Sequence, residues 1–260
     1  MDTRGSQPAL KQDRRFDSVS SQTLSRQISR RLLLSILRGE IEPGGSLPSE
    51  DELAGQFDVS RPVIREAVRE LAVLGMIQSR QGRATRVTPR DSWNHFAPEL
   101  LAAREEVGAV DDILLELLEL RRLIEIEAAA LAATRATDDD VVAMGEALAR
   151  MDERLGDTDA FTDGDIAFHQ AMLGATRNHL LTHLIDLIGP LLRFGRKVSV
   201  ERRPRGAVES QEGHRQILAA VERRDADGAR DAMRLHLSWT ANLDISERER
   251  LLAVDPEPRG

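Results

Sequence analysis

The stretch LPSEDELAGQFDVSRPVIREAVRELAVLG, residues 47–75, contains two helix starts separated by a short turn. Ser49 followed three residues later by Glu52 is the pattern of a capping box, which predicts a short helix at this point. Asp58-Val59 predicts the turn, and Ser60 then caps a second helix that ends before the glycine. The stretch therefore predicts two helices joined by a tight turn.

The second of these helices, predicted from Arg61 to Leu74, carries apolar and basic side chains on different faces. Spacings of three and four direct one set inward, namely Val63, Ala67, Val68, Leu71 and Leu74. Arg61, Arg65 and Arg69 recur every four residues on another face. A row of arginines suits phosphate oxygens and guanine edges, because a guanidinium can donate two parallel hydrogen bonds.

The segments on either side extend this pattern. An apolar stripe at residues 28–37 predicts a preceding helix, and Gly39 and the Pro43-Gly44-Gly45 turn end it. Residues 76–79 and 84–88 predict a two-stranded ribbon around a glycine turn. Helix, helix-turn-helix and ribbon together predict a winged helix-turn-helix, with the start of the Arg61 helix in the DNA major groove. The alternative is a small helical domain whose arginines are only solvated.

The net charge of −8 is distributed unevenly along the 260 residues. Residues 1–90 carry 15 Lys and Arg against 11 Asp and Glu, whereas residues 91–260 carry 21 against 33. The chain has no cysteine, which excludes disulfides, thiolate metal ligands and a cysteine nucleophile. Neither a signal-peptide core nor a run of about 20 apolar residues occurs, so we expect a cytoplasmic protein without a membrane partner. The basic end is the one that would meet DNA.

The remainder of the chain reads as mainly helical. We expect a tail without structure at residues 1–20, a winged helix-turn-helix at 21–90, a connector at 91–109, an antiparallel bundle at 110–245 and a flexible tail at 246–260. The bundle should contain six or seven helices, at about residues 117–133, 141–155, 159–175, 179–196, 208–223 and 226–244. The fold class is therefore mainly α, with a small ribbon in the first domain.

A second group of polar residues lies on the predicted inner faces of the bundle helices. Asp165 and His169 are one helical turn apart, while His214 and His236 adjoin the apolar stripes of the last two helices. One carboxylate and three imidazoles suit Zn²⁺ first, with Ni²⁺, Mn²⁺ or Fe²⁺ as alternatives. The competing interpretation is ordinary core or surface histidine. His179 and His183 share the i, i+4 spacing, yet their neighbours predict an exposed position.

The sequence LPSEDELAGQFDVSRPVIREAVRELAVLGMIQSRQGRATRV closely resembles the DNA-binding domain of GntR-type bacterial transcription regulators, over about residues 24–88. The resemblance implies an operator contact through Arg61, Arg65 and the wing glycine, and a phosphate contact through Ser60. The expected DNA-binding set is Ser60, Arg61, Arg65, Gln81, Gly82 and Arg83. Asp51 departs from the pattern, because several members of the family have a DNA-contacting arginine at this position.

The bundle is similar to the FadR C-terminal ligand-binding domain of the FCD type, over about residues 110–245. The similarity rests on ELRRLIE, DIAFHQAML, RNHLL, EGHRQILAAV and LHL, which occur in the family's order. It implies a divalent metal on Asp165, His169, His214 and His236, and an effector carboxylate that meets the metal and Arg121. Asn178 matches a frequent pocket position. The connector WNHFAPELLAAR is similar to that of branches sensing sugar acids, but departs from it at residues 96–98.

These features together predict a homodimeric regulator that binds a pseudo-palindromic double-stranded operator. We expect it to act as a repressor. A small carboxylate, such as a sugar acid or another hydroxy acid, would control its affinity for DNA. Two alternatives remain: a regulator whose metal is purely structural, and a metal-dependent enzyme that activates water. We expect that the protein is not an enzyme, because the sequence shows no further general base close to the four ligands. An enzymatic role would also leave the helix-turn-helix unexplained.

Overall fold

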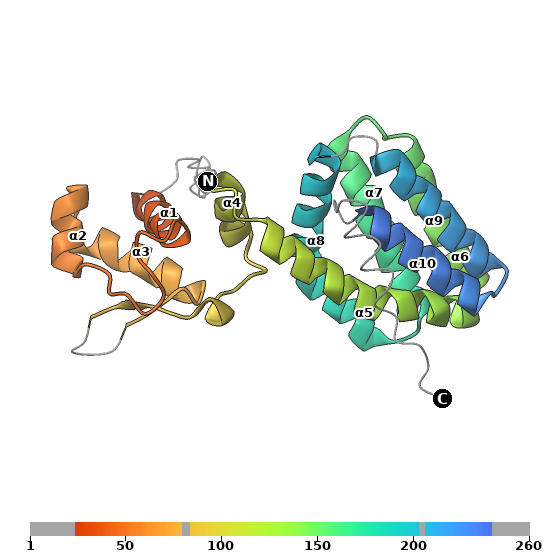
Figure 1. The fold of residues 1–260 in the computed structure, drawn as a ribbon, viewed down its shortest axis with the longest axis horizontal. Helices are drawn as coiled ribbons and strands as arrows, with labels where there is room; N and C mark the ends of the chain where they lie inside the picture. The colour runs from red at the N-terminus through yellow and green to blue at the C-terminus, as the bar shows by residue number, and fades with distance from the viewer. Residues whose placement is uncertain (1–23, 80–83, 203–205, 241–260) are drawn as a thin grey trace, which may run out of the picture.

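The computed structural model describes residues 24–79, 84–202 and 206–240, with side chains described to residue 238. Two units follow one another along the chain, a small N-terminal one and a larger helical one (Figure 1). The expected tails at residues 1–20 and 246–260 lie outside the described residues, as do the predicted DNA-binding residues Gln81, Gly82 and Arg83. The predicted mainly α fold is confirmed.

The N-terminal unit has the element order of a winged helix-turn-helix. Its elements are α1 (Leu24–Leu37), α2 (Glu50–Phe57), α3 (Arg61–Val73), β1 (Ile77–Gln78) and β2 (Arg86–Val87). The two strands pair in an antiparallel manner, with Ile77 opposite Val87. The helices α1 and α3 pack against each other and the ribbon follows α3 directly. The predicted order of elements is confirmed.

Helix ends in this unit follow from local hydrogen bonding. Ser49 and Glu52 form the predicted capping box, and Asp58 adopts a left-handed conformation (φ 51°) that ends α2. Ser60 lies at the N-cap position of α3, but its side chain makes no capping hydrogen bond. The predicted side-chain cap was therefore wrong, because Pro62 has no N–H and the N–H of Val63 donates to the Ser60 carbonyl instead.

The buried face of α3 differs slightly from the predicted one. Ile64, Ala67 and Leu71 are fully buried, whereas Val63 and Val68 are only half-buried. Ala67, Leu71 and Leu74 are buried as predicted, and Ile64 joins them. Val63 and Val68 pack, partly buried, against the same core. The three arginines of α3 are all exposed, as predicted.

The predicted connector contains more structure than we expected. A short 3-10 turn, η1 (Arg90–Ser92), precedes helix α4 (Pro98–Glu106). Trp93 and Leu100 belong to the core of the N-terminal unit, whereas Leu101 belongs to the core of the bundle. An ion pair between Arg30 of α1 and Glu106 also ties α4 to the first unit. The connector is therefore a packed helix that contacts both cores.

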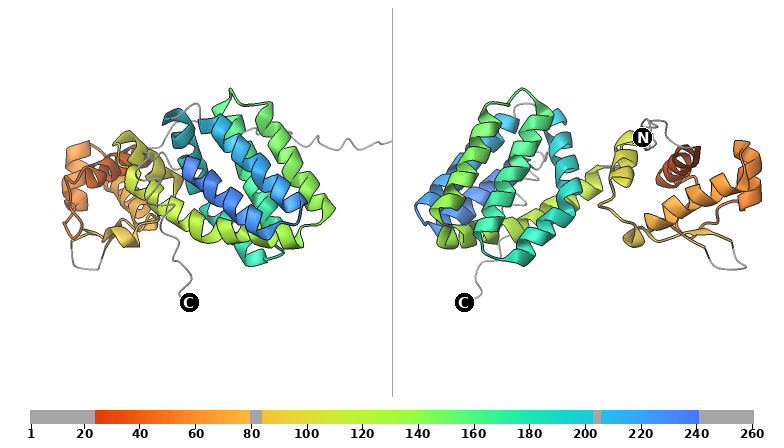
Figure 2. Two further views of the ribbon diagram at one scale, coloured as in Figure 1. Left: turned by 45° about the vertical axis from the view of Figure 1, so that its right-hand side comes forward. Right: turned by 180° about the vertical axis from the view of Figure 1, so that it is seen from behind.

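Six described helices form the second unit. They are α5 (Asp111–Arg135), α6 (Asp138–Asp152), α7 (Thr158–Ala175), α8 (His179–Arg202), α9 (Gly206–Glu222) and α10 (Ala226–Thr240). Helix α10 lies beside α9 and α5, and α7 lies between α6 and α8 (Figure 2). Among the described residues, no helix combines the length and apolar character needed to cross a membrane. The bundle interior brings α5, α7, α9 and α10 together.

Candidate metal centre and DNA-binding face

The four predicted ligands meet in the middle of the bundle. Asp165 and His169 come from α7, His214 from α9 and His236 from α10, and all four side chains are buried. One potential ligand atom from each lies within 4.8 Å of the others. Gly213 allows this approach, because a Cβ at that position would lie only 2.7 Å from Nδ1 of His236. The predicted juxtaposition of these residues is confirmed.

The donor atoms suit a cation. Nε2 of His214 lies 3.3 Å from Nε2 of His169 and 3.2 Å from Oδ1 of Asp165. Among the described residues, neither ring nitrogen of His236 has a hydrogen-bond partner, although the residue is fully buried. A buried polar atom without a partner is costly, and a cation is the partner that several imidazoles can share. Three nitrogens and one carboxylate oxygen form a donor set that Zn²⁺ and related transition metals accept.

The protonation states of the cluster are those that a metal requires. Burial lowers the pKa of His214 to about 4 and lowers that of His236 well below its usual range. Burial alone would raise the pKa of Asp165, but Arg196 and the neighbouring histidines hold it well below its usual range. At neutral pH, both of these histidines therefore keep a free lone pair and Asp165 keeps its negative charge.

Glu125 supports the cluster from α5 and was not identified from the sequence. It is completely buried, and its Oε2 lies 2.8 Å from Nδ1 of His169. A carboxylate on the outer nitrogen of a histidine fixes the ring orientation and leaves the other nitrogen for a metal. Nε of Arg121 donates to the second oxygen of Glu125 at 2.7 Å. The i, i+4 spacing of Arg121 and Glu125 was the available signal for this pair.

Arg196 is a second buried residue that sequence reasoning missed. Its NH2 group lies 2.6 Å from Oδ1 of Asp165, and its NH1 group lies 3.5 Å from Oγ of Ser210. Ile188, Leu192 and Arg196 recur every four residues on α8, so the arginine continues a buried apolar stripe. This stripe was the signal that could have placed Arg196 inside the bundle.

The remaining predicted site residues lie in different places. Arg121 reaches the cluster, with NH2 3.3 Å from Nε2 of His169. Asn178 lies at the start of α8, where its Oδ1 accepts a hydrogen bond from the Leu180 N–H, and its role at an effector remains a prediction. His179 and His183 are exposed, as expected.

The proposed DNA-binding face lies at the start of α3. Arg61 and Arg65 are both exposed there, but their surroundings differ. Nε of Arg61 lies 3.0 Å from Oδ1 of Asp51 on α2. Within the described residues, Arg65 has no charged partner, so its guanidinium is free to bind phosphate or a base edge. Ser60 is exposed beside them, with its hydroxyl not used in capping.

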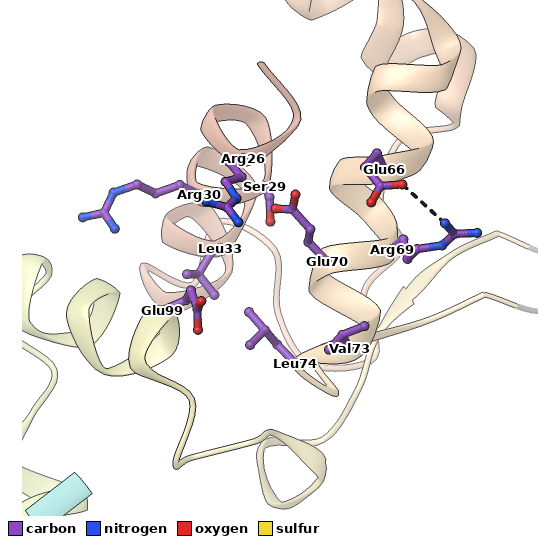
Figure 3. Close-up of a pocket in the computed structure, with 10 residues that line it drawn as sticks. All are labelled: Arg26, Ser29, Arg30, Leu33, Glu66, Arg69, Glu70, Val73, Leu74 and Glu99. Carbon is purple, nitrogen blue, oxygen red and sulfur yellow. Dashed lines mark hydrogen bonds and ion pairs between the residues drawn. The ribbon is translucent and has the colours of Figure 1, made fainter. Parts of the chain in front are cut away.

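A groove between α1, α3 and α4 lies next to this face but differs from it in charge (Figure 3). Its lining combines basic, acidic and apolar side chains: Arg26, Ser29, Arg30, Leu33, Glu66, Arg69, Glu70, Val73, Leu74 and Glu99. Arg69 is already paired with Glu66 across one helical turn. The mixed charges make this groove a poor match for a polyanion.

Comparison with known proteins matches both units. Residues 24–87 match the family described as bacterial regulatory proteins, gntR family, and residues 116–238 match the FCD domain. The HTH-type transcriptional regulator LutR of Bacillus subtilis is 33% identical over 78% of this chain and 93% of its own length. The galactonate operon transcriptional repressor of Escherichia coli is 30% identical, over 76% of this chain and 86% of its own.

A further relative and a solved structure extend these matches. The HTH-type transcriptional repressor NanR of Klebsiella aerogenes is 30% identical over 84% of each chain. The solved structure of Lar from Listeria monocytogenes superposes with a TM-score of 0.60, at 18% identity, over 89% of this chain and 99% of its own. At that identity, the superposition shows that the fold is shared.

Proposed function

We propose, from the premise that this chain belongs to the gntR family of bacterial regulatory proteins and carries an FCD domain, that a small carboxylate controls its affinity for DNA. Its relatives are transcriptional regulators, and this chain is accordingly a DNA-binding regulator and not an enzyme. The protein, in this proposal, binds a divalent metal and an effector. It forms a homodimer and represses transcription by binding operator DNA in the cytoplasm.

The charge balance of the bundle centre is the observation that carries the proposal. Asp165 and Glu125 are paired with Arg196 and Arg121, so the formal charges of these four buried groups cancel. A divalent cation held by Asp165 and the three histidines adds two positive charges for which these groups offer no counter-charge. Because an unbalanced buried charge is costly, the metal-bound site favours an anion.

The residues around the cluster suit a carboxylate. Zn²⁺, Ni²⁺, Mn²⁺ or Fe²⁺, when bound, would supply the positive charge that attracts the carboxylate. Arg121 and Arg196 lie next to the ligand atoms of His169 and Asp165, and either guanidinium can donate hydrogen bonds to a carboxylate. Glu125 already balances the charge of Arg121, so the burial of Arg121 alone does not require an effector. The charge of a bound metal is what favours an anion at this site.

Effector binding can reach DNA through the packed connector. Helix α4 contributes side chains to both cores, so a change in bundle packing can alter the position of the first unit. The effector changes operator affinity by the difference between its binding energies in the two packings, typically about 1–3 kcal/mol. In a symmetric dimer, this difference would alter the spacing of two recognition helices on a pseudo-palindromic operator.

The effector class is tested by thermal shift. One relative is named as the repressor of a galactonate operon, which supports starting with sugar acids and other hydroxycarboxylates. We expect the protein, purified without chelator or nickel resin, to be stabilised by at least one acid, and EDTA to abolish this shift. If metal stabilises the protein but no acid adds to it, the purely structural metal becomes the better description.

Arg65→Ala should weaken binding to operator DNA by about 1–3 kcal/mol, roughly 5- to 150-fold, because it removes an exposed guanidinium that is free, as far as the described residues go, to contact DNA. The DNA is a duplex selected by the wild-type protein from a randomised pool, and affinity is measured by fluorescence anisotropy. Arg69→Ala is the matched control, because Arg69 lies one turn further along and is paired with Glu66. Equal affinities of the Arg65→Ala variant and the wild type would remove Arg65 from the contact set.

A further inference from the structure

Asp51 lies where an acidic residue is unexpected, next to the arginine that begins the proposed recognition helix. It is the second residue of α2, and its Oδ1 lies 3.0 Å from Nε of Arg61, the first residue of α3. The two helices contact each other, and α2 lies with the start of α3 at the end of the molecule farthest from the bundle (Figure 1). Both side chains are mostly exposed, at 68% for Asp51 and 63% for Arg61. The pair is therefore accessible to DNA.

The neighbouring carboxylate of the same helical turn has another use. Glu52 accepts hydrogen bonds from the backbone N–H and the hydroxyl of Ser49, and these bonds lower its pKa. Its position is therefore fixed by the capping box. Asp51 instead reaches α3. Of the three acidic residues in this turn, Asp51 is the one whose ion pair with Arg61 is seen among the described residues.

The atom that Asp51 contacts decides what Arg61 can do. A guanidinium can bind a two-acceptor partner along its side edge, through Nε and one terminal nitrogen, or along its end, through both terminal nitrogens. The carboxylate of Asp51 lies against Nε as an ion-pair partner, which leaves the end-on edge of Arg61 for the O6 and N7 acceptors of guanine. The carboxylate also repels phosphate oxygens, so that Arg61 gains less from the DNA backbone.

We propose that Asp51 is a specificity-determining residue of the DNA-binding face, which directs the terminal nitrogens of Arg61 to a base edge and disfavours phosphate contacts. Asp51 acts through Arg61 and is a positioning residue in this sense. The ion pair is weak in water, but it strengthens when DNA excludes water from the interface. Arg65, which has no charged partner in the part of the chain that the structure describes, keeps its freedom to bind phosphate. The inference rests on the proposed contact between Arg61 and operator DNA.

Asp51→Asn tests the inference in the full-length protein. Binding is measured to the selected duplex and to a scrambled duplex over a range of salt concentrations. We expect the ratio of the two affinities to fall about tenfold or more, mainly through tighter binding to scrambled DNA. The salt dependence on scrambled DNA should steepen by about one unit, because Arg61 gains a phosphate contact. A second selection with the variant should show a relaxed preference at one base pair in each half-site.

Asp58→Asn is the matched control. Asp58 ends the same helix, is exposed, and occupies a left-handed conformation that asparagine tolerates. Asp58→Asn also removes one negative charge near the DNA-binding face. An effect that came only from the change in net charge would therefore appear in both variants. The role of Asp51 would be overturned if neither variant lost selectivity for the selected duplex, or if both variants lost it to the same extent.

The Arg61→Ala background separates this inference from the wider proposal. If Asp51 acts through Arg61, Asp51→Asn should change neither selectivity nor salt dependence when Arg61 is already alanine. If Asp51→Asn still altered selectivity and salt dependence when Arg61 is alanine, Asp51 would act independently of Arg61, contrary to the inference. Failure of the wild-type protein to select any sequence would instead contradict operator recognition itself, and with it the premise of the inference.

Discussion

His214→Ala should reduce the bound metal from about one ion per chain to nearly none, because it removes a donor from the centre of the four-residue cluster. Nε2 of His214 lies within 3.3 Å of donor atoms on both His169 and Asp165. A metal that binds only the folded state stabilises it by about 4 kcal/mol at a thousandfold excess over Kd. At roughly 2–4 °C per kcal/mol, the variant should also melt well below the metal-bound wild type. Metal content is measured by mass spectrometry.

Two comparisons separate the metal from a simple loss of packing. His183→Ala makes the same chemical change on an exposed residue of α8 and should retain the metal. EDTA should lower the melting temperature of the wild type and of His183→Ala, but leave that of His214→Ala unchanged. Full metal retention in His214→Ala would show that the ligand set is wrong.

The order of helices was predictable because its signals are local. The capping box at Ser49 fixes a helix start through atoms three residues apart. The missing cap at Ser60 shows the limit of such reasoning, because a proline in the first turn redirects the hydrogen bonds. The helix in the connector was missed since its two faces belong to different cores, which blurs a single apolar stripe.

The four candidate ligands could be proposed from spacing and resemblance, whereas their partners could not. Asp165 and His169 share one face of one helix, so their proximity follows from helical geometry. Glu125 and Arg196 come from α5 and α8, and their contacts with the cluster depend on how the bundle packs. The charge balance that favours an anion emerges only from these tertiary contacts. A similar limit applies to Asp51, whose partner became evident only when α2 and α3 were placed together.

Glu125→Ala should destabilise the metal-free protein by about 3–5 kcal/mol, because it leaves the buried charge of Arg121 without its partner. Burial alone would lower the pKa of Arg121, but the charge of Glu125 raises it above its usual value. Arg121 therefore stays charged in the wild type. Urea denaturation in EDTA measures the loss, since the chelator removes any contribution of the metal.

Glu127→Ala provides the control two residues further along α5. Its side chain is 61% exposed and pairs with Arg230 at the surface, where an ion pair contributes less than about 1 kcal/mol. The double variant Arg121→Met, Glu125→Leu removes both buried charges and should recover much of the stability lost in Glu125→Ala. If the double variant were as unstable as Glu125→Ala, lost packing would explain the effect. Recovery would instead identify the unpaired guanidinium of Arg121 as the cause.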